Sequence, residues 1–392
     1  MVNFFTIGDK ACTVSIPYAM SKNARVQLFI SPMSLWVDKY RPKKLENLSY
    51  HDSITKSLQS LASSGDFPHL LVYGPSGAGK KTRIYTTLNE LFGAQVEKMK
   101  IDVKTFTTSS NRKLEFNVLS SLHHLEITPS DMGNNDRVVI QDLLKDVAST
   151  EQVDFASQGR PKHRFKIVLI NEADSLTRDA QAALRRTMEK YSANIRLIMV
   201  CNTIANIIAP IKSRTLLVRI PAPSKGEIAL ILLGVAEKEA VKFNPPNDDQ
   251  ARQVYLETVA EASDRNLRRA LLSFETLCMQ NETIQLKNLE AAAITLDWEL
   301  IIQNITKSIL SEPKVATLAK LRLTFYELLS HCIPARLILK MTALQLMDRL
   351  DPAKGTKVLE IAATFDERLS LGQKSIFHLE GFAAKAMVVV LS

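Results

Sequence analysis

The sequence predicts an α/β domain with a parallel sheet, followed by two domains built from helices. Short apolar runs alternate with longer amphipathic segments from about residue 67 to 220, a pattern typical of buried strands separated by helices. The strand pattern stops at the proline-containing segment 221–224. Beyond it, segments 224–295 and 297–392 follow a helical period almost throughout. A chain of 392 residues also exceeds what one compact core normally supports.

The individual elements follow in order along the chain. We expect strands at 69–73, 166–170 and 196–201, because these runs are apolar and short. Helices are expected to begin at Lys80 and Arg178. In the linker, Ser224 is a candidate N-cap, and Glu227 stands at the third position after it, as a capping box requires.

Composition excludes several classes of protein. The 50 Lys and Arg against 41 Asp and Glu give a net charge of +9, which favours contact with a polyanion but equally fits an ordinary solvated surface. The four cysteines are far apart and form no C-x-x-C motif, so neither a zinc cluster nor a disulfide framework is expected. No stretch approaches the roughly 20 apolar residues that cross a bilayer, so we expect no membrane insertion.

The strongest functional motif begins where the first strand ends. An apolar strand runs into a Gly-rich loop and then into a helix, and the loop ends at Lys80. Glycines let consecutive N–H groups point at phosphate oxygens, the helix start adds partial positive charge, and the lysine reaches the terminal phosphates. A tight turn that contains three glycines by chance would not explain the flanking strand and the lysine. We therefore predict that ATP or ADP is held by Gly74, Pro75, Ser76, Gly77, Ala78, Gly79, Lys80, Lys81 and Thr82.

Two positions depart from what hydrolysis needs. After the lysine, the motif requires a Ser or Thr that ligates magnesium, and here Lys81 stands there, with Thr82 one place late. A helix step of roughly 100 degrees points Thr82 away from the metal, and we expect Lys81 to extend outward on its flexible stem. In the acidic strand motif, Asn171 replaces the carboxylate that supports the magnesium shell, while Glu172, the predicted base, remains. We therefore predict weak or absent magnesium binding and little or no hydrolysis.

With these motifs, the chain from about Ser34 onward resembles the small subunits of eukaryotic replication factor C, the AAA+ clamp loader. The resemblance is strongest to the small subunit whose Walker A and Walker B motifs are both irregular. Segment 36–42, Trp-Val-Asp-Lys-Tyr-Arg-Pro, resembles the family's N-terminal box beside the adenine. The resemblance implies base-side contacts from Val37, Tyr40, Arg41 and Ser49. The alternative is an arm that only packs on the domain.

Three more segments resemble family motifs around the nucleotide. Asn202, at the end of a strand, resembles the sensor of the terminal phosphate. Arg214, in a Ser-Arg-Thr sequence where the family has Ser-Arg-Cys, resembles the arginine finger that acts in trans on the neighbour's nucleotide, a role that suits a planar and always charged group. Arg268 resembles the second sensor, although Arg265 and Arg269 stand close enough to be confused with it.

The resemblance also implies contacts outside the nucleotide site. Arg112, Lys113 and Arg137 stand where the family lines its central chamber, and such side chains would hold DNA phosphates without reading the base sequence. Ordinary surface charge is an equal alternative for each of them. The last domain resembles the collar that joins five subunits into a ring.

The resemblance gives an expected fold class, an α/β P-loop AAA+ domain with a parallel sheet, followed by a helical lid and an all-α collar domain. We predict an extension of unknown role at 1–33, the AAA+ domain at 34–221, the lid at 222–295 and the collar at 296–392.

The implied function is that of a nuclear heteropentamer that uses ATP to open a sliding clamp and load it on primer-template DNA in replication and repair. The implied partners are the other four loader subunits, the clamp, the DNA and alternative large subunits of checkpoint and cohesion loaders. Two alternatives stay open. A stand-alone AAA+ remodelling ATPase would need the metal ligands that Lys81 and Asn171 replace. The second is a scaffold that no longer binds nucleotide, and a nucleotide-binding assay would distinguish it from a subunit that does.

Overall fold

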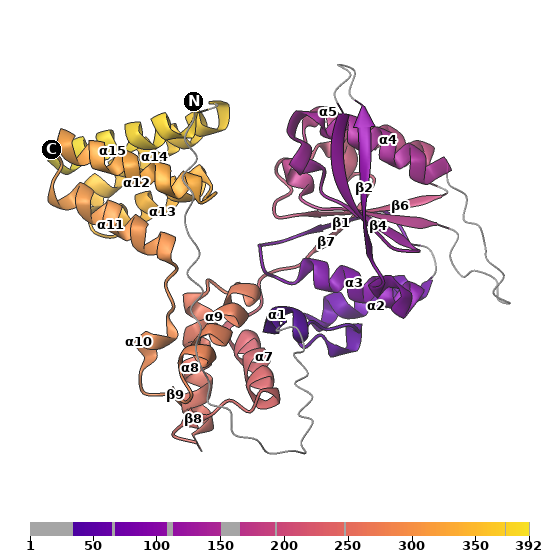
Figure 1. Ribbon diagram of the computed structural model, residues 1–392, viewed down its shortest axis with the longest axis horizontal. Coiled ribbons are helices and arrows are strands. Elements are labelled where there is room, and N and C mark those ends of the chain that lie inside the picture. Colours follow the sequence, from indigo (N-terminus) through magenta and orange to yellow (C-terminus); the bar gives the residue numbers. More distant parts are fainter. Residues whose placement is uncertain are drawn as a thin grey trace, which may run out of the picture.

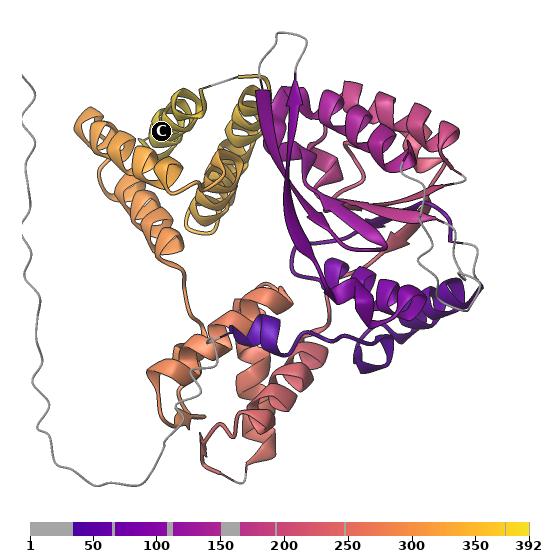
Figure 2. The same cartoon turned by 45° about the vertical axis from the view of Figure 1, so that its right-hand side comes forward.

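The computed structural model describes residues 34–64, 67–107, 113–149, 165–192, 194–246, 248–372 and 374–391. The predicted extension 1–33 and Arg112 lie outside these described residues. Three bodies follow one another along the chain, an α/β body, a helical lid and a C-terminal helical body (Figures 1 and 2). The predicted boundaries after residues 33, 221 and 295 stay predictions. Among the described residues, no helix combines the length and apolarity needed to cross a membrane.

The sheet of the first body has seven strands in the order β2-β3-β4-β5-β6-β1-β7. Its parallel part consists of β4 (His124–Ile127), β5 (Lys166–Ile170), β6 (Ile195–Cys201), β1 (Leu70–Tyr73) and β7 (Leu216–Arg219). The remaining strands, β2 (Lys100–Thr107) and β3 (Lys113–Ser120), pair antiparallel and extend the edge beside β4. The three strands expected from the sequence, β1, β5 and β6, are confirmed. The other four strands were not expected.

Helices cover both faces of β1, β5 and β6, which explains why the apolar runs of these strands show no alternation. Leu70 and Val72 pack in one core cluster with side chains of α2 (Asp52–Ser64) and α3 (Lys80–Phe92). Leu71 packs on the opposite face with side chains of α4 (Asp136–Ser149) and α5 (Arg178–Lys190). The predicted helix starts at Lys80 and Arg178 are confirmed. The short elements are α1 (Trp36–Lys39), η1 (Leu45–Asn47), η2 (Ala94–Glu97), η3 (Pro129–Asn135), η4 (Ala173–Ser175) and α6 (Ala209–Lys212).

The lid contains α7 (Lys225–Lys238), α8 (Asp249–Ala262), α9 (Leu267–Gln280) and α10 (Leu289–Ala292). The predicted capping box is confirmed, since Ser224 Oγ accepts from the Glu227 N–H at 3.2 Å and the Glu227 carboxylate accepts from the Ser224 N–H at 2.7 Å. The expectation that strands end before the linker is wrong in one detail. Two-residue strands β8 (Phe243–Asn244) and β9 (Ile284–Gln285) pair in parallel within the lid.

The C-terminal body is entirely helical within the described residues. Its helices are α11 (Asp297–Ser311), α12 (Val315–Ser330), α13 (Ala335–Met347), α14 (Pro352–Leu371) and α15 (Ser375–Leu391). Phe365 of α14 and Phe382 of α15 pack edge to face in their shared core, with ring centres 6.4 Å apart. Phe377, also in α15, is instead exposed.

Candidate nucleotide site

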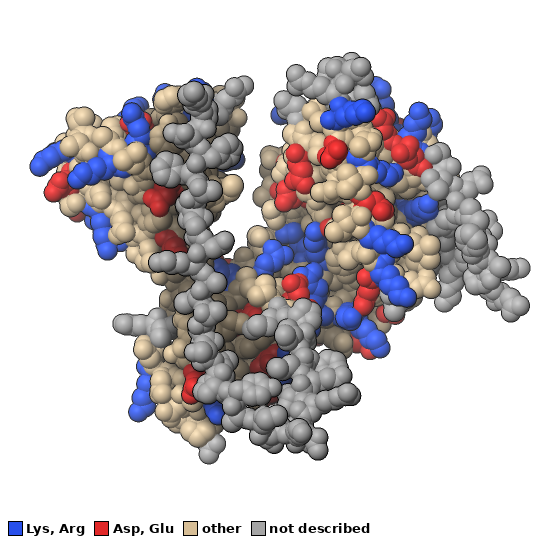
Figure 3. Space-filling model, viewed as in Figure 1, with Lys and Arg blue, Asp and Glu red and all other residues tan. Residues whose placement is uncertain are grey.

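A pocket of about 530 Å³ lies where the phosphate loop, the N-terminal arm (residues 34–42) and the lid meet. Lys and Arg side chains gather on the face where the α/β body borders the lid (Figure 3). The structure brings most of the predicted site residues to this pocket. Its lining includes Val37, Tyr40, Arg41, Ser49, Ser76, Gly77, Gly79, Lys80, Lys81, Thr82, Asn171, Glu172, Asn202 and Arg268.

Gly77 and Gly79 of the phosphate loop have a backbone conformation that only glycine adopts without strain. Gly77 and Gly79 have φ values of +74° and +82°, in the left-handed region. A Cβ atom would lie 1.7 Å from Asn266 Oδ1 at Gly77 and 2.1 Å from the Tyr50 hydroxyl oxygen at Gly79. The N-cap residue of α3, which follows the loop directly, is Gly79, and glycine has no side chain to cap the helix start. The loop therefore leaves backbone N–H groups for an anion, and its form fits the phosphates of a nucleotide.

Three predicted loop residues shape the site without lining it. Ala78 is buried, and its carbonyl accepts a hydrogen bond from the Tyr50 hydroxyl at 3.3 Å. The carbonyls of Gly74 and Pro75 both accept from the Lys80 ammonium, at 2.7 and 2.8 Å.

Lys80 is tied back onto its own loop. Besides the two carbonyls, its Nζ donates to Asn202 Oδ1 at 2.9 Å, so all three ammonium protons have acceptors. Burial lowers the pKa of Lys80 from its ordinary value. Asn202 is held in turn, because its backbone N–H donates to Asp174 Oδ2 at 3.1 Å.

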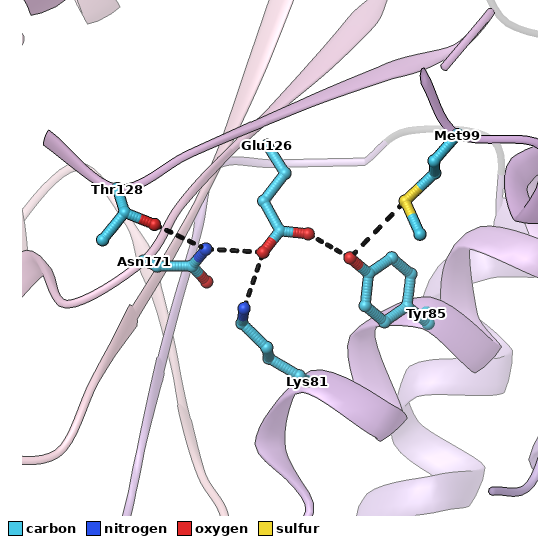
Figure 4. A network of polar contacts seen from close by, with 6 residues as sticks. All are labelled: Lys81, Tyr85, Met99, Glu126, Thr128 and Asn171. Atoms are coloured by element: carbon cyan, nitrogen blue, oxygen red, sulfur yellow. Dashed lines mark hydrogen bonds and ion pairs between the residues drawn. The ribbon is translucent and has the colours of Figure 1, made fainter. Parts of the chain in front are cut away.

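Lys81 does not extend outward, so that expectation is wrong. Its Nζ lies 2.6 Å from Glu126 Oε1, and Glu126 is a buried residue of β4 (Figure 4). The same Oε1 accepts from Asn171 Nδ2 at 2.6 Å, while the Tyr85 hydroxyl donates to Oε2. Because an unpaired buried carboxylate is costly, it draws the lysine inward. Glu126 was missed in the sequence, although a lone acid within the strand His-Leu-Glu-Ile was a signal.

The surroundings of Glu126 and Tyr85 shift both of their pKa values from the ordinary ones. Burial alone would raise the pKa of Glu126, but hydrogen bonds from Lys81, Tyr85 and Asn171 outweigh it and hold this pKa below its ordinary value. Burial, together with the hydrogen bond to Glu126, raises the pKa of the Tyr85 hydroxyl well above its ordinary value. At neutral pH Glu126 is therefore an anion surrounded by donors.

The residues at the two metal-supporting positions do not fit magnesium. Magnesium prefers oxygen ligands in octahedral geometry, whereas Lys81 offers only N–H donors and a positive charge. The Glu126 carboxylate already accepts from three donors. Asn171 Oδ1 is the one acceptor left, since it is buried and has no hydrogen-bond partner in the described part of the chain. Within that part there is also no group of three or more His, Cys, Asp or Glu side chains that could hold a metal.

Glu172, the predicted base, lies at the pocket in an unusual backbone conformation. It is exposed, has a φ of +50° and directly precedes η4. Its Oε2 accepts from Ser130 Oγ at 3.1 Å. A positive φ at a non-glycine residue is sparsely populated and clusters at functional sites.

Three arginines stand close together in the lid sequence, and one of them lines the pocket. Arg268 lines the pocket. Arg265 instead donates to the carbonyls of Pro223 and Ala222, at 2.9 and 3.0 Å. Arg269 forms an ion pair with Glu299 at 2.9 Å. Arg268 is thus the one of the three that lines the pocket, and its role as the second sensor stays a prediction; the other two have structural partners.

The N-terminal arm, which lines one side of the pocket, is anchored on the lid. The Trp36 N–H donates to Glu275 Oε2 at 3.1 Å, and Lys39 pairs with Glu239 at 2.6 Å. Trp36, Val37 and Tyr40 also pack against the apolar core of the lid. The arm therefore both packs on the protein and lines the pocket, so the two alternatives for it are compatible.

The remaining predicted residues lie outside the pocket lining. Arg214 is exposed and held by Glu189 of α5, with Nε and one terminal nitrogen 2.9 and 2.6 Å from Glu189 Oε1. Lys113 and Arg137 are exposed at the starts of β3 and α4. Their predicted roles, in trans and on DNA, stay predictions.

Comparison with known proteins identifies the family. Residues 298–392 match the family model described as "Replication factor C subunit 3, C-terminal domain", residues 230–279 match "RCF1/5-like, AAA+ ATPase lid domain", and residues 50–224 match "DNA polymerase III, delta subunit". These matches and the observed architecture confirm the fold class, an AAA+ α/β domain with a lid and an all-helical C-terminal domain. A RuvB structure from Thermotoga maritima matches with a TM-score of 0.46 and 14% identity, over 72% of this chain and 85% of that one.

Relatives are similar over nearly their whole length. Replication factor C subunit 5 of Saccharomyces cerevisiae is 54% identical, with 91% of this chain and 99% of the relative covered. Subunit 5 of Schizosaccharomyces pombe is 48% identical and subunit 3 of Homo sapiens 46%, each with 91% of this chain and 96% of the relative covered. The chain therefore belongs to the replication factor C family, as one of its small subunits.

Proposed function

We propose that this chain works in a nuclear heteropentameric clamp loader, which uses ATP to open a sliding clamp and load it on primer-template DNA during replication and repair. Family membership and the names of the relatives as replication factor C subunits support this role. The partners would be the other four subunits, the clamp, the DNA and, in checkpoint and cohesion loaders, alternative large subunits.

The chain's own site would hold ATP or ADP with little or no hydrolysis. The observation that carries this proposal is the pairing of Lys81 and Asn171 with one oxygen of Glu126, at the two positions that should support magnesium. The loop N–H groups and Lys80 would bind the phosphates, and Lys80 would exchange a loop carbonyl for a phosphate oxygen. The arm would hold the base, and Arg268 would join the phosphates to the lid.

Hydrolysis needs more than the base that remains. Glu172 lies at the pocket and could accept a proton from water. The developing charge on the transferred phosphoryl group needs compensation as well, which a divalent cation normally gives. Because the donor set at Lys81 and Asn171 opposes that cation, Glu172 alone would give slow turnover.

Arg214 would act on the neighbour's nucleotide. It lies outside its own pocket, and Glu189 holds its guanidinium in an exposed position. Such an exposed ion pair contributes little to stability, so exchanging Glu189 for a phosphate costs little. Lys113 and Arg137, with Arg112, would contact DNA phosphates.

The test is binding of labelled ATP to the purified full chain at low magnesium, together with phosphate release. We expect retained binding with almost no release of phosphate, and loss of binding in Lys80→Ala. Lack of binding by the unmodified chain would favour the scaffold alternative. Turnover comparable to that of regular family members would favour an active ATPase and contradict the passive role. Lys81→Thr combined with Asn171→Asp is expected to increase magnesium-dependent turnover.

A further inference from the structure

We propose, resting on the nucleotide site proposed above, that Lys81 is the built-in cation of that site. Its ammonium, held by the buried Glu126 carboxylate, would take the place of the divalent ion, so that a nucleoside di- or triphosphate binds with an affinity independent of magnesium.

The position of Lys81 fits this role. Lys81 and Asn171 occupy the two sequence positions whose side chains normally support the metal, and both donate to Glu126 Oε1 at 2.6 Å. Two donors on one oxygen atom lie close together in space. The ammonium therefore lies between the phosphate-loop helix and the end of β5, on the wall of the pocket (Figure 4).

The Lys81 ammonium has N–H donors that can bind a phosphate. An ammonium group has three protons, and Lys81 donates to one acceptor within the described chain, Glu126. The side chain of Lys81 is 40% exposed, whereas that of Glu126 is 4% exposed. The Lys81 ammonium therefore has N–H donors left for phosphate oxygens. The Lys80 ammonium, in contrast, donates all three of its hydrogen bonds, to Gly74, Pro75 and Asn202.

The Lys81 side chain is held in place before any ligand binds. Lys side chains in water lose considerable freedom when they bind, but Lys81 is already fixed by an anion that is itself fixed. Tyr85 holds the second oxygen of Glu126, and Asn171 is tied to Thr128 Oγ1 at 3.3 Å as well. A prearranged positive charge costs little to use when phosphate arrives.

A purely structural ion pair would look different. A buried carboxylate that needed only neutralisation would be served by a lysine with its ammonium enclosed. Here the lysine keeps contact with the pocket and with solvent. A divalent ion placed beside it would meet a like charge at contact distance, which is unfavourable.

The test is equilibrium binding of fluorescent ADP to the full chain, once with excess magnesium and once with excess EDTA. We expect the two dissociation constants to agree within about twofold. Lys81→Met combined with Glu126→Gln removes both charges together and leaves no unpaired carboxylate. The amide oxygen of the introduced glutamine can still accept from Asn171, and its N–H group can donate to the Tyr85 hydroxyl oxygen in place of accepting from it. This double variant is expected to bind ADP about tenfold more weakly in EDTA, with an unchanged circular dichroism spectrum.

The matched control is Lys56→Met, which removes an exposed lysine of α2 outside the pocket lining and should leave the affinity unchanged. Lys81→Arg keeps the charge and should retain binding in EDTA. Magnesium-dependent binding by the unmodified chain, or a double variant that matches it in EDTA, overturns the role of Lys81 but keeps the nucleotide site. Absence of binding in both buffers overturns the proposed nucleotide site itself.

Discussion

The guanidinium of Arg83 lies 4.7 Å from the centre of the Tyr50 ring, and both side chains are buried beneath the phosphate loop. Arg83 also donates to Thr55 Oγ1 at 2.6 Å and to the Tyr50 carbonyl. Tyr50 in turn supports the loop through the Ala78 carbonyl. The loop thus stands on an aromatic ring that a buried arginine fixes.

Replacement of Arg83 should therefore destabilise the α/β domain. Arg83→Leu removes charge-assisted hydrogen bonds from a fully buried site, and we expect a loss of about 3 kcal/mol in the free energy of unfolding. Urea denaturation followed by circular dichroism measures it. Arg178→Leu, at an exposed position of α5, should change stability by less than about 0.5 kcal/mol. Equal effects of the two variants would contradict the support assigned to Arg83.

A side chain at Gly77 should impair nucleotide binding. Gly77→Ala forces a methyl group into the left-handed region and against Asn266 of the lid, so the loop or the lid must move. We expect ADP binding to weaken at least about tenfold. Gly226→Ala is the matched control, because an added Cβ there meets nothing within 4 Å and alanine favours the helix by up to about 1 kcal/mol. The idea fails if Gly77→Ala binds normally.

The ionised Glu126 carboxylate should make the free energy of unfolding depend on pH. Its pKa in the folded protein is below the ordinary value, so the folded state favours the anion. This contribution is fully present above the unfolded pKa, near about 4.3, and is lost as pH falls through the folded pKa. We expect Glu126→Gln to cost about 1–3 kcal/mol at neutral pH.

The difference between this variant and the unmodified chain should shrink below about pH 4. Urea titrations over a series of pH values follow it. A difference that is constant down to strongly acidic pH would contradict the assigned charge state.

Loss of Arg214 should act on the neighbouring subunit. In the reconstituted complex, Arg214→Ala is expected to lower ATP turnover by about a hundredfold or more at the site it completes, while ADP binding by the isolated chain stays the same. Single-turnover phosphate release measures the first and fluorescent ADP titration the second. Arg219→Ala, an exposed arginine of β7, serves as control. Weaker binding by isolated Arg214→Ala would place this arginine at its own nucleotide.

The parts of the fold that were predictable are those whose signals are local. Strands β1, β5 and β6 are buried on both faces, so each contains an apolar run, at residues 70–73, 167–170 and 197–201. Strand β3 alternates instead, with Phe116 and Val118 buried and Asn117 exposed between them. One face of this strand is solvated, so it forms no continuous apolar run. The four-residue β7 is largely exposed and gives hardly any pattern.

The residues of the candidate site also fall into those that a local sequence pattern predicts and those that it does not. The phosphate loop is one continuous motif, so its residues could be named from spacing. Glu126 lies 45 residues from both Lys81 and Asn171, and no local pattern links them. The outward course expected for Lys81 is wrong because a lysine viewed alone prefers water, and the anion that attracts it becomes visible only in three dimensions.

The anchoring of the N-terminal arm divides the walls of the pocket between two bodies. Tyr40 packs with the lid, whereas Lys80 belongs to the helix that packs on the sheet. If the lid moves relative to the sheet, the wall formed by the arm moves with it, and the wall formed by the phosphate loop stays with the sheet. A ligand that contacts both walls would fix the angle between the lid and the α/β body, and its dissociation would let this angle change.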